Sequence, residues 1–167
     1  MNAEALHTCP LAVGLQPRAV ESLRAMMTER TVSAGELIVS VGEPGDALYV
    51  IVEGAVKVVI SDNTGQDIVL MRLRKGQFFG EMSVLDSRPR SARVEATDRT
   101  TVLKIPARDF KAAMASYPVL AQNLARELCL RLRHANATIS KLSNSDLSTR
   151  LALSVMPPEV DEEERSV

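Results

Sequence analysis

The sequence is poor in aromatic residues, cysteine and histidine. Aromatic residues make up 3% of the 167 positions, tryptophan is absent, and there are two cysteines and two histidines. Cys9 and Cys129 lie far apart in different kinds of segment, so we expect free thiols rather than a disulfide framework or a paired-cysteine metal site. His7 and His134 lie outside the predicted strands, and we therefore expect no metal ion.

Long hydrophobic runs and a surplus of either charge are also missing. No window reaches the roughly 18 apolar residues of a membrane span, and the start "MNAEALHTCPLAVGL" lacks the basic segment and apolar run of a secretory signal. The 20 basic and 21 acidic residues give a net charge of −1, which does not indicate a nucleic-acid surface. We expect a cytoplasmic protein that neither spans a membrane nor contacts DNA directly.

Glycine is absent after residue 80. Seven of the eight glycines lie between residues 35 and 80, among short β-branched runs such as "ALYVIVEG" and "AVKVVIS". Glycines between such runs are typical of short antiparallel strands joined by tight turns. We predict an antiparallel β-roll, a jelly-roll-like barrel, over residues 31–106, in which the alternation of "ARVEA" gives a later strand one buried face.

Helical periodicity flanks the predicted β-roll. Residues 11–30 carry apolar side chains at spacings of three and four, which predicts one amphipathic N-terminal helix. Residues 107–151 contain no glycine and predict a short helix followed by a long one. The predicted fold class is therefore α+β.

We expect one domain over residues 1–151. At this length a globular chain buries roughly 68–70% of its unfolded surface, which allows one substantial core. The segment 152–167 combines two helix-breaking prolines with clustered acidic residues, and we expect it to be a disordered tail.

The long predicted helix begins at Pro118 and carries a seam of apolar residues. The members of the seam alternate in spacing between four and three, and they are Ala121, Ala125, Leu128, Leu132, Ala135, Ile139 and Leu142. Such heptads favour packing against a second helix, most simply the same helix of a second subunit. The alternative is a helix that packs on its own β-roll, a contact for which Leu120, Leu124 and Leu130 are available.

The segment "GEMSVLDSRPRSA", residues 80–92, places a carboxylate and a guanidinium near one short predicted helix. A helix that begins at Gly80 or Glu81 leaves its first amide groups unpaired, and these groups attract an anion. Arg90, expected on the next strand, adds charge-assisted hydrogen bonds to the same anion. Glu81 repels a phosphate but accepts hydrogen bonds from hydroxyl groups, such as those of a ribose. The pair therefore indicates a phosphorylated sugar as ligand.

Two stretches, "GEPGDALYVIVEGAVKV" and "FFGEMSVLDSRPRSARVEA", resemble the cyclic-nucleotide-binding domain of catabolite-activator-type regulators, cyclic-nucleotide-dependent kinases and gated channels. The resemblance runs from Leu11 to Leu142. The matching positions are Gly42, Gly45, Asp46, Tyr49 and Gly54 at the turns of the family, and Gly80, Glu81, Arg90, Ser91 and Ala92 in its phosphate-binding cassette.

The resemblance implies a role for each residue of the cassette. Glu81 is expected to accept a hydrogen bond from the ribose 2′-hydroxyl, and Arg90 to pair with the cyclic phosphate. The anion site is expected to be completed by backbone amides and one hydroxyl, at Gly80, Met82, Ser83 and Ser91. The expected apolar wall around the sugar and base consists of Val69, Met71 and Phe79. The resemblance implies no cofactor besides the nucleotide.

Simpler roles stay open for the same residues. Glu81 could only cap its helix, and Arg90 could be a structural ion-pair partner of Glu81. Asp46 is expected to form a turn rather than bind a ligand. A cupin-type enzyme would share the β-roll but needs imidazoles and carboxylates clustered inside it, and no nucleophile motif is present. We therefore expect a receptor and not an enzyme.

The sequence departs from the regulators of this family in its long helix. Where those regulators supply a threonine and a serine to the adenine, an ungapped alignment places Ala135 and Asn136. Asn136 can both donate and accept hydrogen bonds, so it is the candidate contact to the base. The preference between cyclic AMP and cyclic GMP stays open.

The same regulators continue after the long helix into a winged helix-turn-helix, whereas this sequence ends 16 residues past Leu151. Because the acidic tail is typical of a natural terminus, we expect a stand-alone sensor that dimerises and acts on a partner protein through its C-terminal helices. Two alternatives stay open. One is the sensor part of a transcription regulator whose DNA-binding domain lies outside this chain, and the other is a ligand-free dimerisation scaffold.

Overall fold

The computed structural model describes the backbone of residues 4–155 and the side chains of residues 6–143. The described residues form two compact units, which divide after Arg126. The first unit contains the described strands and the start of the last helix, and the second contains the rest of that helix. From residue 156 onward, the predicted tail lies outside the described residues.

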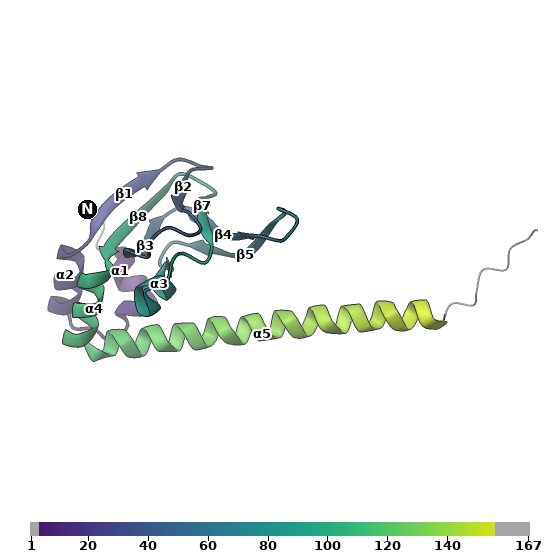
Figure 1. Ribbon diagram of the computed structural model, residues 1–167. Coiled ribbons are helices and arrows are strands. Elements are labelled where there is room, and N and C mark those ends of the chain that lie inside the picture. The colour runs from purple at the N-terminus through teal and green to yellow at the C-terminus, as the bar shows by residue number, and fades with distance from the viewer. Residues whose placement is uncertain (1–3, 156–167) are drawn as a thin grey trace, which may run out of the picture. The chain divides into compact units, whose positions relative to one another are not determined.

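Eight strands in the described part of the chain form two sheets. Their bounds are β1 Thr28–Val32, β2 Leu37–Val39, β3 Ala47–Glu53, β4 Ala55–Ser61, β5 Asp67–Arg74, β6 Phe78–Phe79, β7 Arg93–Ala96 and β8 Thr100–Pro106. One sheet has the order β1-β8-β3-β6 and the other the order β2-β7-β4-β5, with antiparallel pairing throughout. The predicted antiparallel β-roll is confirmed, with the β4–β5 hairpin projecting from it (Figure 1). The two sheets share no strand, so the barrel is not closed.

Three short helical segments precede the first strand. They are α1 Glu4–Thr8, the 3-10 helix η1 Pro10–Ala12 and α2 Pro17–Ala25. Helix α2 confirms the predicted amphipathic helix, because Pro17 stands in its first turn and Val20 and Leu23 are buried. Strand β1 begins at Thr28, inside the segment that was expected to be helical up to residue 30. This β-branched stretch pairs with β8 instead of continuing the helix.

The hydrophobic core joins the two sheets. In β3, Leu48 and Val50 are 0% exposed. One buried cluster includes Val94 of β7 together with Tyr49 of β3 and Val102 of β8, which belong to the other sheet. The alternation predicted in "ARVEA" is confirmed, because β7 alternates between partly exposed and buried residues.

The C-terminal helices are α4 Ala107–Ser116 and α5 Pro118–Val155, separated at Pro118 as predicted. Within the first unit, Leu120 and Leu124 at the start of α5 are buried. Their burial confirms that this part of α5 packs on its own domain, a contact that the sequence left as an alternative.

In the second unit, the apolar seam of α5 is exposed at four of its residues, and Leu128 is partly buried. The exposed fractions are 62% for Leu132, 61% for Ile139 and 66% for Leu142, and Leu130 off the seam is 44% exposed. A row of exposed apolar side chains at heptad spacing is suited to a second helix, and the predicted second subunit stays a prediction.

Candidate functional site

The site predicted around residues 80–92 begins with a glycine in the left-handed conformation. Gly80 has a φ of 84° and stands directly before helix α3, Glu81–Asp86. A Cβ atom at Gly80 would lie 2.6 Å from Nη1 of Arg90 and 3.0 Å from the oxygen of Ala47. Residue 80 is therefore suited only to glycine, both for its backbone conformation and for the close approach of Arg90. The predicted start of the helix is confirmed.

Arg90 is a buried cation beside this helix. It is 4% exposed, and its Nη1 and Nη2 atoms donate to the oxygens of Gly80 at 2.9 Å and of Ala47 at 2.6 Å. Nη2 also lies 3.7 Å from the carboxylate of Asp46, and the guanidinium carbon lies 5.8 Å from the centroid of the Tyr49 ring. These contacts use only part of the five N–H groups of a guanidinium, so the oriented group is able to bind an anion bidentately.

The backbone of Arg90 is also fixed. Its amide donates to the oxygen of Glu43 at 2.9 Å, and its oxygen accepts a hydrogen bond from the amide of Gly42 at 3.0 Å. Arg90 lies between α3 and β7, which begins at Arg93, so its predicted place on the next strand is wrong. The physical reason is Pro89, which has no amide hydrogen to donate to a strand ladder.

Asp46, expected from the sequence only to form a turn, contacts two cations. Its carboxylate lies 2.9 Å from Nζ of Lys104 and 3.7 Å from Nη2 of Arg90. The hydrogen bond that Lys104 donates to Asp46 raises the pKa of Lys104 above its usual value. Because Lys104 lies 58 residues away along the chain, no local sequence pattern predicts this contact.

Helix α3 has a buried side that includes Glu81, Ser83 and Val84. Glu81 is 5% exposed and Ser83 is 4% exposed, whereas Met82 between them is 54% exposed. A Cβ atom at Gly45 would lie 2.0 Å from Cβ of Ser83, so the loop before β3 packs tightly against this helix. The same loop also contacts Arg90, and it therefore braces both halves of the predicted cassette.

The three residues predicted for the apolar wall lie in different surroundings. Phe79 is 3% exposed and stacks on Tyr49, with ring centroids 5.0 Å apart and ring planes 9° apart. Met71 on β5 packs against the same core cluster that includes Phe79. Val69, two residues before it, is 43% exposed. The structure therefore brings Phe79 and Met71 together, whereas Val69 lies at the surface.

The two remaining residues of the predicted site are both exposed. Ser91 directly follows the buried Arg90. Asn136 belongs to the second unit, and its contact with the base stays a prediction. Two residues further along the helix, Thr138 donates its hydroxyl to the main-chain oxygen of His134 at 3.0 Å.

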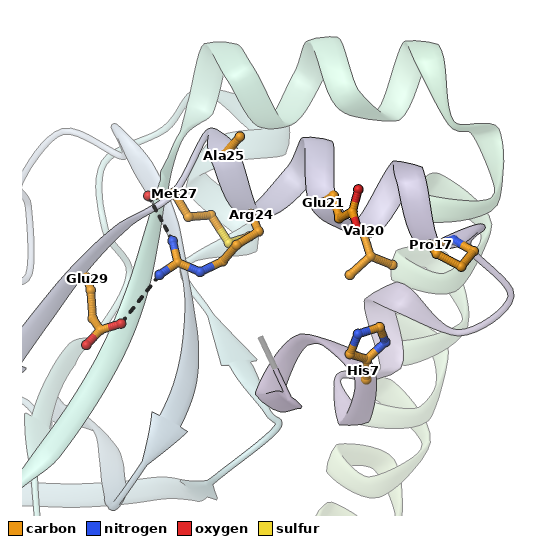
Figure 2. Close-up of a pocket in the computed structure, with 8 residues that line it drawn as sticks. All are labelled: His7, Pro17, Val20, Glu21, Arg24, Ala25, Met27 and Glu29. Carbon is orange, nitrogen blue, oxygen red and sulfur yellow. Dashed lines mark hydrogen bonds and ion pairs between the residues drawn. The ribbon is translucent and has the colours of Figure 1, made fainter. Parts of the chain in front are cut away.

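A hollow of about 840 Å³ lies elsewhere in the first unit, between α1, α2 and the start of β1. Figure 2 shows Arg24 at one end, where its guanidinium donates to the oxygen of Met27 at 3.3 Å and pairs with Glu29 at 3.5 Å. His7 lies across the hollow from α2. No residue of the segment 80–92 lines this hollow, and its one arginine is already paired. The residues predicted from the sequence to bind a ligand therefore lie outside this hollow.

Three further features of the described residues concern the cysteines, metal-ligand groups and membrane-spanning helices. Cys9 is buried and Cys129 is exposed, and the two cysteines are not joined in a disulfide. Among the described residues, no group of three His, Cys, Asp or Glu side chains is placed to hold a metal ion. None of the described helices is long and apolar enough to cross a membrane.

The fold is the β-roll of the cyclic nucleotide-binding domain. The sequence profile of the cyclic nucleotide-binding domain matches residues 29–117. A cyclic AMP receptor protein of Thermus thermophilus is 34% identical over 147 residues, which are 88% of this chain and 68% of that protein. The chain therefore belongs to the cyclic nucleotide-binding domain family, and the resemblance read from the sequence is confirmed.

A potassium channel and a solved crystal structure are also similar to this chain. A cyclic nucleotide-gated potassium channel of Mesorhizobium japonicum is 33% identical over 137 residues, 82% of this chain and 36% of the channel. The crystal structure of the Thermus thermophilus catabolite activator protein matches with a TM-score of 0.74 and 36% identity, over 80% of this chain and 63% of that one. The chain thus spans only part of the length of each relative.

Proposed function

We propose that the chain is a receptor for a cyclic nucleotide, cyclic AMP or cyclic GMP, and not an enzyme. One observation carries the proposal: the buried guanidinium of Arg90 is fixed beside Gly80, directly before the buried Glu81. A fixed cation and a carboxylate together suit a ligand that presents a phosphate and a ribose hydroxyl. The relatives named for cyclic AMP and for a cyclic nucleotide support the same ligand class.

Each side chain has a distinct part in this proposal. Arg90 donates two hydrogen bonds to the oxygens of the cyclic phosphate, while Glu81 accepts one from the ribose 2′-hydroxyl. The hydroxyl of Ser91 and the amides at the start of α3 donate to the phosphate. Met71 and Val69 on β5 contact the sugar and the base, and Phe79 supports them.

Isothermal titration of the whole chain with cyclic AMP and with cyclic GMP tests the proposal. We expect micromolar binding of at least one nucleotide, equivalent to about −8 kcal/mol. Arg90→Ala is expected to abolish the heat of binding. The nucleotide that binds more tightly identifies the signal and shows whether the base is read as adenine or guanine.

Arg88→Ala is the matched control, because Arg88 is exposed and lies two residues before Arg90. It should bind as the unchanged chain does. Glu81→Gln tests the second half of the cassette without changing its shape, and we expect about tenfold weaker binding from the loss of one charged acceptor. Circular dichroism of each variant separates a lost ligand contact from a lost fold. Absence of heat with both nucleotides would leave a dimerisation scaffold as the function.

The proposal includes transmission of the signal through the helices after Pro106. The chain is expected to form a homodimer through a seam made up of Leu128, Leu132, Ala135, Ile139 and Leu142. The exposure of three of these residues supports this contact. Nucleotide binding between Gly80 and Arg90 then favours one arrangement of the helices, and a partner protein binds that arrangement. Asn136, next to the seam, is the candidate contact to the base.

A second candidate is the sensor part of a transcription regulator. It is favoured by the Thermus thermophilus relative, because the chain spans 68% of that protein. A helix-turn-helix encoded directly after residue 167 would decide for this candidate, and its absence would decide for a sensor that acts on a separate partner. In either case we propose a cytoplasmic location, because Cys9 and Cys129 are not joined in a disulfide and disulfides are rare in reducing compartments.

A further inference from the structure

A pocket of about 440 Å³ lies where the β3–β4 turn, the end of β5 and the β7–β8 turn meet. Three cations line it, namely Arg72, Arg74 and Lys75, together with the single carboxylate of Asp98. We call it the basic pocket. None of the residues proposed to bind the nucleotide lines it.

The geometry of the strand places both arginines on one face of the sheet. Arg72 and Arg74 are exposed, whereas Leu73 between them is 4% exposed, as expected for a strand with one buried face. Among the described residues, no ion-pair partner lies within reach of these two side chains or of Lys75. The pocket therefore presents positive charge to solvent.

This concentration of positive charge is unfavourable in the absence of an anion. Arg72 stands directly opposite Lys57 in the register of β4 and β5. The carboxylate that Lys57 contacts is Glu95 of β7, at 2.8 Å. Like charges opposite one another destabilise a sheet, and Arg74 and Lys75 add two more within three residues. An anion bound in the pocket would offset this repulsion.

The floor of the basic pocket is rigid. Thr97 donates to the oxygen of Ala55 through its amide at 2.9 Å and its hydroxyl at 3.1 Å. The amide of Ala55 donates to Oγ1 of Thr100 at 3.2 Å. Gly54 has a φ of 83°, and a Cβ atom there would lie 2.5 Å from the oxygen of Arg99. A pocket that is already ordered loses little conformational entropy when it binds a ligand.

Strand β5 also offers backbone groups beside the basic pocket. It is an edge strand, paired only with β4 among the described strands. An extended peptide can pair with such an edge, and its alternate side chains then lie along one face. Arg72 and Arg74 have the same two-residue spacing, and each guanidinium can bind a carboxylate through two parallel hydrogen bonds.

We propose that the basic pocket binds an acidic segment of a partner protein, which pairs with the edge of β5 and places alternate carboxylates against Arg72 and Arg74. Nucleic acid is a poorer occupant, because the three cations can neutralise fewer phosphates than the roughly six to ten of a typical DNA contact. The carboxylate of Asp98 also repels phosphates. A role limited to protecting a free edge from aggregation predicts no such binding. The proposal does not depend on the nucleotide site.

Fluorescence polarisation of the whole chain with a labelled peptide in which glutamate and threonine alternate tests this proposal. We expect binding that weakens as salt is added and that falls about tenfold or more in Arg72→Gln/Arg74→Gln. The same peptide with glutamine in place of glutamate should not bind. Arg18→Gln changes an exposed arginine on α2, outside the pocket, and should bind the peptide as the unchanged chain does.

Asp98→Asn provides an independent variant, because it removes the one carboxylate that opposes an acidic ligand. We expect about threefold tighter binding of the peptide. Circular dichroism should show all three variants folded, since their altered side chains are exposed. Absence of binding by the unchanged chain, or equal binding by the double variant, would overturn the proposal. Tighter binding of a labelled DNA duplex than of the peptide at the same salt would overturn the assignment to a protein partner.

Discussion

The side-chain amide of Asn123 donates to the main-chain oxygen of Val13 at 2.7 Å, across 110 residues of the chain. The same nitrogen donates to the oxygen of Leu11 at 3.0 Å, and Nη1 of Arg126 donates to Oδ1 of Asn123 at 3.2 Å. Asn123 is 4% exposed. A buried amide therefore fixes the first turns of α5 to the N-terminal segment.

Asn123→Ala is expected to lower the free energy of unfolding by about 1–3 kcal/mol, because it leaves the main-chain oxygens of Leu11 and Val13 without their donor, the first of them in a buried contact. Urea unfolding followed by circular dichroism measures this change. Gln122→Ala removes an exposed amide from the preceding position of the same helix and should change the free energy by less than about 0.5 kcal/mol. Equal stability of the two variants would show that the buried hydrogen bonds contribute nothing.

Gly80→Ala is expected to lower stability and to weaken nucleotide binding. The new Cβ atom would lie 2.6 Å from Nη1 of Arg90, and Gly80 has a φ of 84°. Backbone strain and the displacement of Arg90 together should lower the free energy of unfolding by about 2–4 kcal/mol. Urea unfolding and isothermal titration with cyclic AMP and cyclic GMP measure the two effects.

Gly35→Ala separates strain from displacement in this experiment. Gly35 has a φ of 80°, and no atom lies within 4 Å of the position that a Cβ atom would take. Only the backbone strain remains, so we expect a loss of about 1–2 kcal/mol and unchanged nucleotide binding. If both alanine variants lost the same stability and bound nucleotide equally well, the close approach of Arg90 to residue 80 would affect neither stability nor nucleotide binding.

The turn between β4 and β5 is held by the carboxylate of Asp62. It accepts hydrogen bonds from the amide and hydroxyl of Thr64, at 2.8 and 2.7 Å, and from the amide of Gln66 at 2.9 Å. These bonds, above all that from the Thr64 hydroxyl, hold the pKa of Asp62 below its usual value. A carboxylate with a lowered pKa stabilises the fold above the ordinary pKa of aspartate, and this contribution is lost as the pH falls through the pKa of the folded chain.

Asp62→Ala should therefore destabilise the chain at neutral pH, and the difference should shrink as the pH falls below about 4. Urea midpoints of the two chains at a series of pH values measure this difference. Asn63→Ala changes an exposed, uncharged residue of the same turn, so its effect should not vary with pH. A difference for Asp62→Ala that stays constant from neutral to acid pH would show that its charge does not stabilise the turn.

The fold and the cassette could be predicted because their signals are local. Gly80, Glu81 and Arg90 lie within eleven consecutive residues, and the strands are separated by glycine turns. The contacts of Arg90 with Ala47 and of Lys104 with Asp46 could not be predicted, because they span 43 and 58 residues and depend on how the sheets pair. The alternation of buried and exposed side chains that is usual in a strand does not predict the surroundings of Val69, because Ile68 and Leu70 on either side are exposed as well.

The apolar seam of α5 predicts how the oligomer responds to charge. In the proposed homodimer, Leu132 and Ile139 occupy the helix interface, so Leu132→Glu/Ile139→Glu would bury like charges from both subunits. We expect the dimer to weaken at least about hundredfold, equivalent to roughly 3 kcal/mol, because buried carboxylates without partners are strongly unfavourable. Light scattering coupled to size-exclusion chromatography measures the mass of each variant over a range of concentrations.

Ala137→Glu is the matched control for the seam, because Ala137 is exposed and lies off the seam on the same helix. This variant should remain dimeric, since its new carboxylate faces solvent in a two-helix arrangement. The double variant should keep its circular dichroism spectrum, because Leu132 and Ile139 lie outside the compact unit that ends at Arg126. A dimer that survives Leu132→Glu/Ile139→Glu, or an unchanged chain that is monomeric at every concentration, would exclude the seam as the interface. Transmission to a partner would then require another surface of the chain.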